Sequence, residues 1–456
     1  MTYGENDDRG PWWERIARIP VDAVKSLVRI WAGHAAVAGE AAGFRTMRVG
    51  SAERRRLLAA LLAAETAGSG GGGGFASAPA WDSSAAGGGA AIGSDGASSG
   101  GGAATEGGAF DGGPYARLIG RILRETRERN RNNATRTAAY RGFYERRPEV
   151  HWAFLAHMVS RNGGWNMTDL RGDLLPRLLS AATRRHMFDM LEDANAFIFG
   201  DAYPQLLLYE ESLRAGRPLF SLLPAFGVSR FMRPVWERFW ETRDSALLTV
   251  ALIVNEQHYI EGRVVQNPEV QRRVLGTLPF QAQAALQLNQ VFFPYEQRGP
   301  SGRRRLAGLI LTDFGSLKER IDVGKRLYGI LFGIPSVRDG AERFAAAQPH
   351  TGSRADYWPE LFAAVRDRPP EASYAERLDG ETLRPGAPRF YSPRLLDAWN
   401  DRPLREPERY DWLRDPKRAC AYLTDAAPPF PFEMSAEYCY GLNKVELAVL
   451  AGGALR

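Results

Sequence analysis

Apolar residues recur every three or four positions near the start of the chain. Residues 11–48 begin with Pro-Trp-Trp-Glu and continue through Ile16, Val24, Leu27 and Trp31, with basic residues between them. This spacing predicts a helix with one apolar face. Two interpretations of that face stay open: it packs on the rest of the protein, or it makes a peripheral contact with a membrane, where Trp beside Lys or Arg is typical.

A second helix is predicted from Ala52 to about Glu65, and from Pro114 onward helical patterns follow one another. Breakers such as Gly163-Gly164 and Tyr203-Pro204 separate them. The clearest helices are expected at residues 149–162, 204–215, 232–242, 245–264, 268–290 and 315–333. No segment alternates convincingly with period two, so strands are not expected. The pattern predicts an all-α protein, either a multi-helix bundle or an irregular helical domain.

Composition divides the chain. Its 456 residues exceed the roughly 250–300 at which a single core stops growing. Of the 48 glycines, 18 lie between Gly68 and Gly113, a stretch without Lys or Arg that cannot bury enough surface to order itself. We therefore expect a disordered Gly/Ser/Ala-rich insertion. The predicted units are an N-terminal helical region at 1–67, this linker at 68–113, a main helical domain at 114–335, and a Pro/Arg-rich extension at 336–456 packed on the core.

Four long motifs carry a resemblance to a known family. They are RNRNNATRTAAY from Arg129, HWAFLAHMVSRNGGWNMTDL from His151, DAYPQLLLYEES from Asp201 and ALIVNEQHYIEGRVVQNP from Ala251. Over about residues 117–335, with an extension through the HTGSR sequence at 350–354, the chain resembles the YppC-like bacterial proteins, domain-of-unknown-function family 2515. The resemblance implies no established activity, so no catalytic role is transferred from it. The Gly-rich stretch is foreign to the family pattern.

Polar residues interrupt three otherwise apolar helices within these motifs. The expected set is His157 and Arg161 on one helix, Glu210 and Glu211 on a second, and Asn255, Glu256, His258 and Tyr259 on a third. Because a buried Arg or His needs partners, these groups either satisfy one another as a structural network or line a polar pocket. In the pocket, a histidine would transfer protons and a carboxylate would orient it.

A basic stretch from Arg117 to Arg147 holds ten arginines against three glutamates. Within it Arg127, Asn130, Asn133 and Arg136 are candidates for binding phosphate or nucleic acid. The alternatives are a solvated helix surface, or internal pairing of Arg127 and Arg136 with Glu210, Glu211 or Glu256. An Asn-rich run also suits the end of a helix, since amide side chains compete for backbone hydrogen bonds.

The sequence contains no motif for several common kinds of chemistry. The spacing of His, Cys and Glu matches no ferritin-like, HExxH or zinc pattern, and no nucleotide-binding loop or nucleophile elbow occurs, so no metal and no cofactor is expected. Two cysteines and an acidic N-terminus without a secretory pattern predict a cytoplasmic protein without a transmembrane segment. We expect a non-catalytic protein that binds a protein partner or a small ligand, with an enzyme of unfamiliar type and a nucleic-acid or phosphate binder as alternatives.

Overall fold

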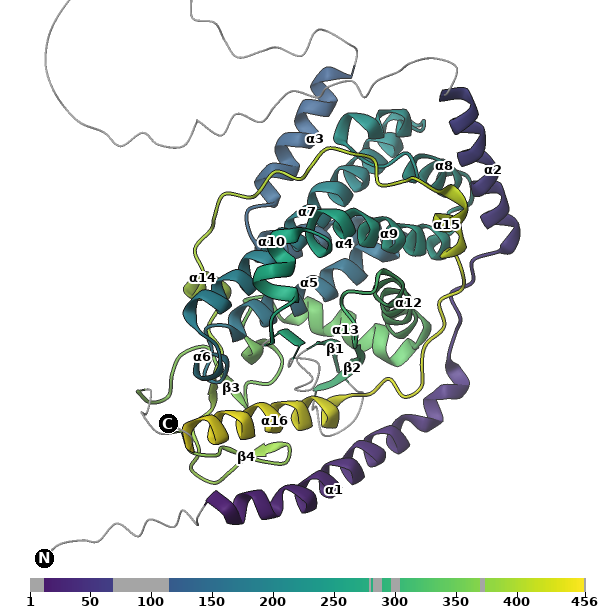
Figure 1. Cartoon of the computed structure of the whole chain (residues 1–456). Helices are drawn as coiled ribbons and strands as arrows, with labels where there is room; N and C mark the ends of the chain where they lie inside the picture. Colours follow the sequence, from purple (N-terminus) through teal and green to yellow (C-terminus); the bar gives the residue numbers. More distant parts are fainter. Residues whose placement is uncertain are drawn as a thin grey trace, which may run out of the picture.

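The computed structural model describes residues 12–68, 115–278, 280–281, 289–296, 304–369 and 374–454, with the side chains of the first helix described from Val24 onward. The insertion predicted at 68–113 lies outside these ranges except for Gly68, as do residues 1–11. The described chain is predominantly helical, which confirms the expected helical character (Figure 1).

The N-terminal half is built almost entirely from helices. They are α1 (Trp12–Val37), η1 (Ala38–Gly43), α2 (Ser51–Gly68), α3 (Ala116–Arg129), α4 (Asn133–Arg146), α5 (His151–Asp169), α6 (Leu175–Leu178), α7 (Ala181–Ala215), η2 (Phe220–Phe226), α8 (Met232–Thr242), α9 (Ser245–Ile260), α10 (Pro268–Val270) and the π-helical turns η3 (Glu261–Val265) and η4 (Gln271–Leu275).

The C-terminal half mixes helices with short strands. They are β1 (Gln290–Glu296), β2 (Arg304–Ile310), α12 (Leu317–Gly333), α13 (Pro335–Ala347), η5 (Arg354–Asp356), β3 (Phe362–Ala363), β4 (Leu378–Asp379), β5 (Thr382–Leu383), β6 (Phe390–Tyr391), α14 (Leu395–Ala398), α15 (Pro416–Ala421) and α16 (Ser435–Ala454). The described strands form three two-stranded sheets: β1 and β2 antiparallel, β3 and β6 parallel, and β4 and β5 antiparallel.

Helix α5 is the centre of the core because it is apolar on nearly every side. Trp152, Phe154, Met158 and Trp165 are buried, and the helix packs against α4, α7, α9, α12 and β1. The predicted stop at Gly163-Gly164 was wrong, since the helix continues to Asp169. Here glycine permits close packing: a Cβ on Gly164 would lie 2.4 Å from Nε2 of His350.

The predicted helix start at residue 204 was also wrong. Helix α7 begins at Ala181, capped by Ser180, and passes through Pro204 to end at the left-handed Gly216. An internal proline costs roughly 3 kcal/mol. The burial of Phe197, Phe199, Leu206 and Leu208 along the same helix outweighs that cost.

The β1–β2 hairpin was not expected from the sequence. Its register pairs Gln290 with Ile310 and Phe293 with Ala307. The helix predicted at 268–290 is therefore wrong at its end, where Gln290 begins a strand. The sequence QVFFPYE is apolar almost throughout because α5 and α13 both pack on β1, so the alternation that marks a half-buried strand is absent.

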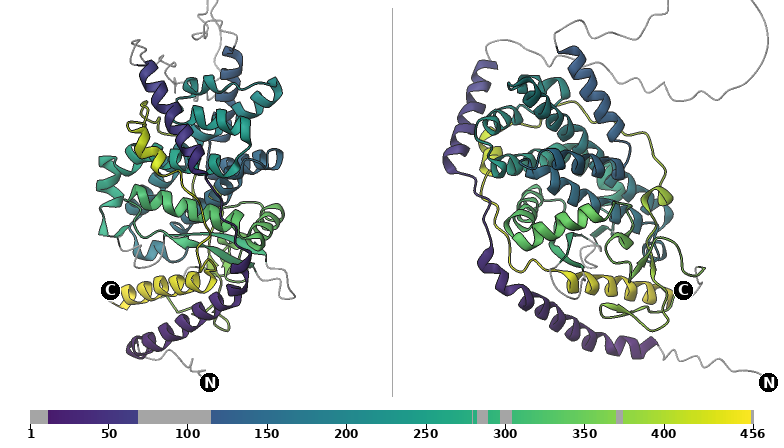
Figure 2. Two further views of the ribbon diagram at one scale, coloured as in Figure 1. Left: turned by 90° about the vertical axis from the view of Figure 1, so that its right-hand side faces the viewer. Right: turned by 180° about the vertical axis from the view of Figure 1, so that it is seen from behind.

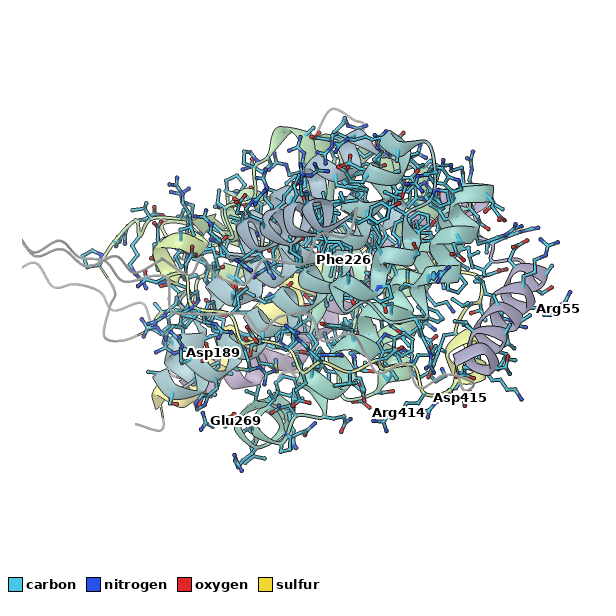
Figure 3. All side chains as sticks on the ribbon, turned by 90° about the horizontal axis from the view of Figure 1, so that it is seen from above. Arg55, Asp189, Phe226, Glu269, Arg414 and Asp415 are labelled. Atoms are coloured by element: carbon cyan, nitrogen blue, oxygen red, sulfur yellow. The ribbon has the colours of Figure 1, made fainter. Side chains whose placement is uncertain are left out.

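Residues 399–434 form a long segment, the C-terminal belt, that crosses the outside of the helical domain before α16 (Figure 1). Viewed from above, its residues Arg414 and Asp415 lie near α2, whereas Asp189 lies toward the other end of the molecule (Figure 3). Hydrogen bonds fix the belt along its path: Asn132 Nδ2 to Asp401 at 2.7 Å, and Trp412 Nε1 to Asn255 at 2.9 Å. The boundary predicted at residue 335 stays a prediction.

Helices α1 and α16 lie side by side at one end of the molecule, with the small β4–β5 hairpin beside them (Figures 1 and 2). In the described part of the chain, no helix is long and apolar enough to cross a membrane.

Candidate functional site

A pocket of about 420 Å³ lies between segments from both halves of the chain. It lies among the end of α5, α6, the start of α7, β1, β3, β6 and α16. This volume is within the range of roughly 300–1,000 Å³ that small-molecule sites occupy.

Apolar side chains supply most of the lining. Their sources are α6 and its flanking turns, α7, the strands and α16, and they include Leu170, Leu174, Leu175, Leu178, Leu179, Met187, Met190, Leu191, Phe280, Val291, Phe292, Phe362 and Phe390. The long, unbranched methionines suit a surface that adapts to the shape of a bound molecule.

One face of α16 forms a continuous wall. Tyr438, Leu442, Val445 and Ala448 recur at the three- and four-residue spacing of one helix face, and all four line the pocket. At 1.5 Å of rise per residue, the wall from Tyr438 to Ala448 is about 15 Å long. The pocket is therefore elongated along α16.

An ion pair between the buried Arg354 and the partly exposed Asp169 interrupts the apolar lining. Arg354 Nε lies 2.7 Å from Oδ1 of Asp169, and Arg354 Nη2 lies 2.5 Å from Oδ2. Burial lowers the pKa of Arg354, but the charge of Asp169 outweighs this and holds the pKa well above its ordinary value. The guanidinium thus stays charged and is already neutralised by the protein.

Two polar groups beside this ion pair keep hydrogen-bonding capacity. Asn166 accepts from Arg354 through Oδ1 at 3.2 Å, which leaves its amide protons for another partner. Tyr357 accepts from Arg354 at 2.7 Å and donates to the Tyr438 hydroxyl at 3.0 Å, so the proton of Tyr438 is available as well. Both Asn166 and Tyr438 line the pocket, so a ligand can hydrogen-bond there without bringing a charge.

The second carboxylate of the lining is saturated. Asp173 pairs with Arg366 and with Arg377 Nη1 at 2.7 Å, and it accepts from the backbone N–H of Tyr391 at 2.7 Å. These bonds fix the turn after α5 against β6. Asp173 is therefore a structural anchor of the pocket wall.

His157 and Arg161 lie outside this pocket. His157 Nδ1 lies 2.9 Å from the carbonyl of Thr137, and its ring stacks on Phe154, while burial lowers its pKa well below the ordinary value. Arg161 donates to the carbonyl of Gln348 at 2.9 Å and stands over the ring of Phe344 at 4.5 Å. Both side chains are held by α4, α5 and the residues after α13.

The acidic candidates on α7 face arginines. Glu210 accepts from Arg146 Nε at 2.9 Å and Nη2 at 3.1 Å, and Glu211 lies 2.7 Å from Arg121. These partners differ from the ones expected from sequence, since Glu210 does not pair with Arg136. The two glutamates connect α7 to α3 and α4.

The candidates on α9 divide between two clusters. Asn255 donates to the buried Asp201 and accepts from Trp412, whereas Glu256 accepts from Trp152 Nε1 at 3.2 Å. Burial raises the pKa of Asp201 to about 7 and that of Glu256 to about 7.

The remaining two α9 candidates make stacking contacts. His258 Nδ1 lies 2.8 Å from the carbonyl of Val254, and its ring stacks on Trp412. Tyr259 lies under the guanidinium of Arg263, with 3.9 Å between the Arg263 Cζ and the ring centroid. None of the eight candidates lines the described pocket. Asn255 and His258 share a contact with Trp412, and the other candidates contact different residues.

The candidate anion-binding residues lie where α3 passes into α4. Asn130 and Asn133 are used internally: Asn130 Nδ2 donates to the carbonyl of Ala196 at 3.0 Å, and Asn133 Nδ2 donates to that of Ser160 at 2.9 Å. Arg136 is buried against Glu192 at 2.6 Å. Arg127 lies exposed on α3. Arg136 therefore pairs inside the protein, which was one of the alternatives, but its partner is Glu192 and not Glu210, Glu211 or Glu256.

The residues that define the pocket's polar part were not selected from the sequence. Asp169 and Asn166 stand in the motif that begins at His151, and Arg354 ends the HTGSR sequence. The signal in the sequence that could have identified this site was the pair of opposite charges on Asp169 and Arg354. Their separation of 185 residues kept them from being paired.

Comparison with known proteins assigns the chain to a family. The sequence model of the family described as "Protein of unknown function (DUF2515)" matches residues 128–435. The chain belongs to this family. It is 44% identical over 240 residues to "Uncharacterized protein YppC" of Bacillus subtilis (strain 168), an alignment that covers 53% of this chain and 73% of that protein. No solved structure matches it significantly.

The family match contains both members of the pocket's ion pair, Asp169 and Arg354, and ends where α16 begins at Ser435. In the described residues, no group of three or more His, Cys, Asp or Glu side chains is placed to hold a metal ion.

Proposed function

We propose that this protein is a non-catalytic binding protein for an elongated, neutral amphipathic small molecule. The observation that carries the proposal is the apolar pocket of about 420 Å³ with the neutralised Arg354–Asp169 pair in its lining. Pockets of this kind use apolar walls for affinity and a few placed polar groups for orientation.

The chemistry of the lining selects the ligand class. Leucine, methionine and phenylalanine side chains favour a hydrocarbon body, and the wall along α16 favours an extended one. Asn166 and Tyr438 offer protons to a hydroxyl or carbonyl oxygen of the ligand. A charged head group is disfavoured because Asp169 already neutralises Arg354, and a second charge would enter an apolar cavity without a partner.

The alternative of an enzyme built on His157, Arg161 and the acidic residues of α7 and α9 has less support. Most of their polar groups already bond to protein atoms, and none of these residues lines the described pocket. Proton transfer needs a base within hydrogen-bond reach of a bound substrate. The phosphate-binding alternative also has less support, because Asn130, Asn133 and Arg136 are used internally.

We also propose a cytoplasmic location and an irregular all-α classification for the fold. Cys420 and Cys439 are buried thiols, as is common in a reducing compartment. The irregular classification is supported by helices of very unequal length and by the two π-helical turns.

The test is a thermal-shift series on the full chain with straight-chain alcohols and the matching carboxylates. A neutral long-chain alcohol at about 100 times its dissociation constant adds about 2.7 kcal/mol of stability, a clear rise in Tm. Ala448→Phe, which places a ring in the pocket wall, should abolish that rise. Ala451→Phe, at an exposed position near the end of the same helix that is not part of the pocket lining, should retain it.

The folded state of both variants is checked by their circular dichroism and by Tm without ligand. A rise that persists unchanged in a folded Ala448→Phe variant would place binding elsewhere and contradict the proposal. Stabilisation by the carboxylates alone would contradict the neutral head group.

A further inference from the structure

Helix α1 carries a row of exposed apolar side chains. Val24, Leu27, Val28 and Trp31 retain 60%, 59%, 60% and 72% of their accessible surface. Their spacing of three and four residues places them on one face of the helix, which we call the α1 stripe. Four of the eight most exposed large apolar residues described are in this stripe, and the others are scattered over different elements. Scattered apolar residues are ordinary on protein surfaces, whereas a row of four is a surface patch.

The C-terminal end of α1 attaches the helix to the protein. His34 Nε2 lies 2.5 Å from Oε1 of Glu437 on α16, and Val37 is fully buried. A Cβ on Gly33 would lie 2.8 Å from the carboxylate of Glu433, so this end of the helix is tightly packed. At 100° per residue, Gly33 and Val37 lie away from Val24 and Val28. The α1 stripe therefore faces away from the domain.

Basic residues accompany the stripe. Lys25 is exposed on α1, the guanidinium of Arg29 lies against Gly380 in the β4–β5 turn, and the helix sequence as a whole has Arg15, Arg18, Lys25 and Arg29 against Glu14 and Asp22. A cationic flank beside an apolar face containing Trp matches the charge and polarity of an anionic lipid surface. A protein groove would also cover the apolar face, but it would not require the basic flank.

We propose that α1 docks on the surface of a membrane that contains anionic lipids. The helix lies parallel to the bilayer, with the stripe at the boundary between head groups and acyl chains and with Lys25 near the lipid phosphates. Because α1 is at one end of the molecule, the helical domain stays in water above it (Figures 1 and 2). This proposal does not depend on the pocket or its ligand.

The test is sedimentation of the full chain with vesicles of phosphatidylcholine alone or mixed with phosphatidylglycerol. The protein should bind the mixed vesicles and not the neutral ones. Leu27→Gln combined with Trp31→Gln should weaken vesicle binding at least tenfold. The burial of a single apolar side chain already contributes roughly tenfold to affinity. Lys25→Gln should weaken it about fivefold, and added salt should reduce the effect of that substitution.

The matched control is Val365→Gln combined with Leu396→Gln. These residues are 76% and 61% exposed and lie outside α1, so vesicle binding should be unchanged. Ala448→Phe should also bind vesicles normally, which separates surface docking from lipid uptake by the pocket. The Tm of every variant shows that it is folded.

Three outcomes would overturn the proposal. The first is equal binding of neutral and anionic vesicles, and the second is normal vesicle binding by a folded Leu27→Gln/Trp31→Gln variant. The third is that the wild-type protein does not bind vesicles and instead forms a dimer, which the Leu27→Gln/Trp31→Gln substitutions dissociate. The last result would assign the α1 stripe to a second copy of the chain.

Discussion

Arg354 clamps both carboxylate oxygens of Asp169, so the end of α5 and the HTGSR turn are joined across 185 residues of sequence inside a mainly apolar pocket. Tyr357 and Tyr438 extend this pair to α16 through their hydroxyl groups. One charge pair thus positions three walls of the candidate binding site.

Asp169→Asn should destabilise the protein strongly. The substitution leaves the Arg354 guanidinium buried without a counter-charge, a change that costs about 3–5 kcal/mol. Urea unfolding at neutral pH measures the loss. Asp367→Asn is the control: it removes the partner of Arg389 in an exposed pair, for which a loss of at most about 1 kcal/mol is expected. Equal, small losses in both variants would contradict the structural role of the Arg354–Asp169 pair.

Asp201→Asn should change the pH dependence of stability. Burial raises the pKa of Asp201 to about 7, so the folded protein keeps a proton that the unfolded chain releases near its ordinary pKa. The stability contributed by this group is complete below about pH 4 and is lost as the pH rises through about 7. The free energy of unfolding of the wild type, minus that of the variant, should therefore fall across this range. A constant difference in urea titrations from about pH 4.5 to 8 would disprove the assignment.

His151→Gln should give the opposite slope over nearly the same range. Burial, with a smaller contribution from the charge of Arg338, lowers the pKa of His151 to about 4. The unfolded chain then binds the proton first, so the stability contributed by neutral His151 is present above about pH 6.5 and is lost as the pH falls toward 4. The difference between wild type and variant should rise with pH. A difference that stays constant in urea titrations between about pH 4 and 7 would contradict the burial of this histidine.

Gly164→Ala and Gly200→Ala should have opposite effects although both glycines are inside helices. A methyl group on Gly164 would collide with His350 and with Asn133 Oδ1, at 2.4 and 2.5 Å, which costs about 1–3 kcal/mol. On Gly200 the nearest atom is Nδ2 of Asn130 at 3.6 Å, an ordinary contact, so the better helix propensity of alanine should add up to about 1 kcal/mol. Thermal unfolding of the two variants compares them directly, and a stabilised Gly164→Ala protein would refute the close contact.

Helical periodicity was enough to predict α8, α9 and α12 to within four residues at each end, and α9 and α12 begin at the capping residues Asp244 and Ser316. It failed where tertiary packing overrides local preference, as at Pro204 in α7 and at Gly163-Gly164 in α5. The β1–β2 hairpin was missed because burial on both faces removes the alternation of a strand.

The candidate site was harder to predict than the fold. The residues chosen from the sequence, such as His157 and Glu210, are polar groups in apolar helices, and the structure satisfies most of them with backbone carbonyls and nearby arginines. The pocket depends instead on α16 meeting the end of α5 and the HTGSR turn. That meeting arises from contacts between distant segments, which no local pattern encodes.

The C-terminal belt determines when, during synthesis, the tertiary contacts of the helical domain can all be formed. Asn255 in the middle of α9 obtains its bond from Trp412, and the backbone N–H of Val49 after α1 obtains its bond from Asp425, so helices made early are completed only by residues made late. During synthesis the N-terminal segments leave the ribosome first and begin to fold first. The Oδ1 of Asn255 therefore has its Trp412 partner only after another 157 residues have been synthesised. A nascent chain halted before residue 399 carries a helical domain that the C-terminal belt does not yet cover.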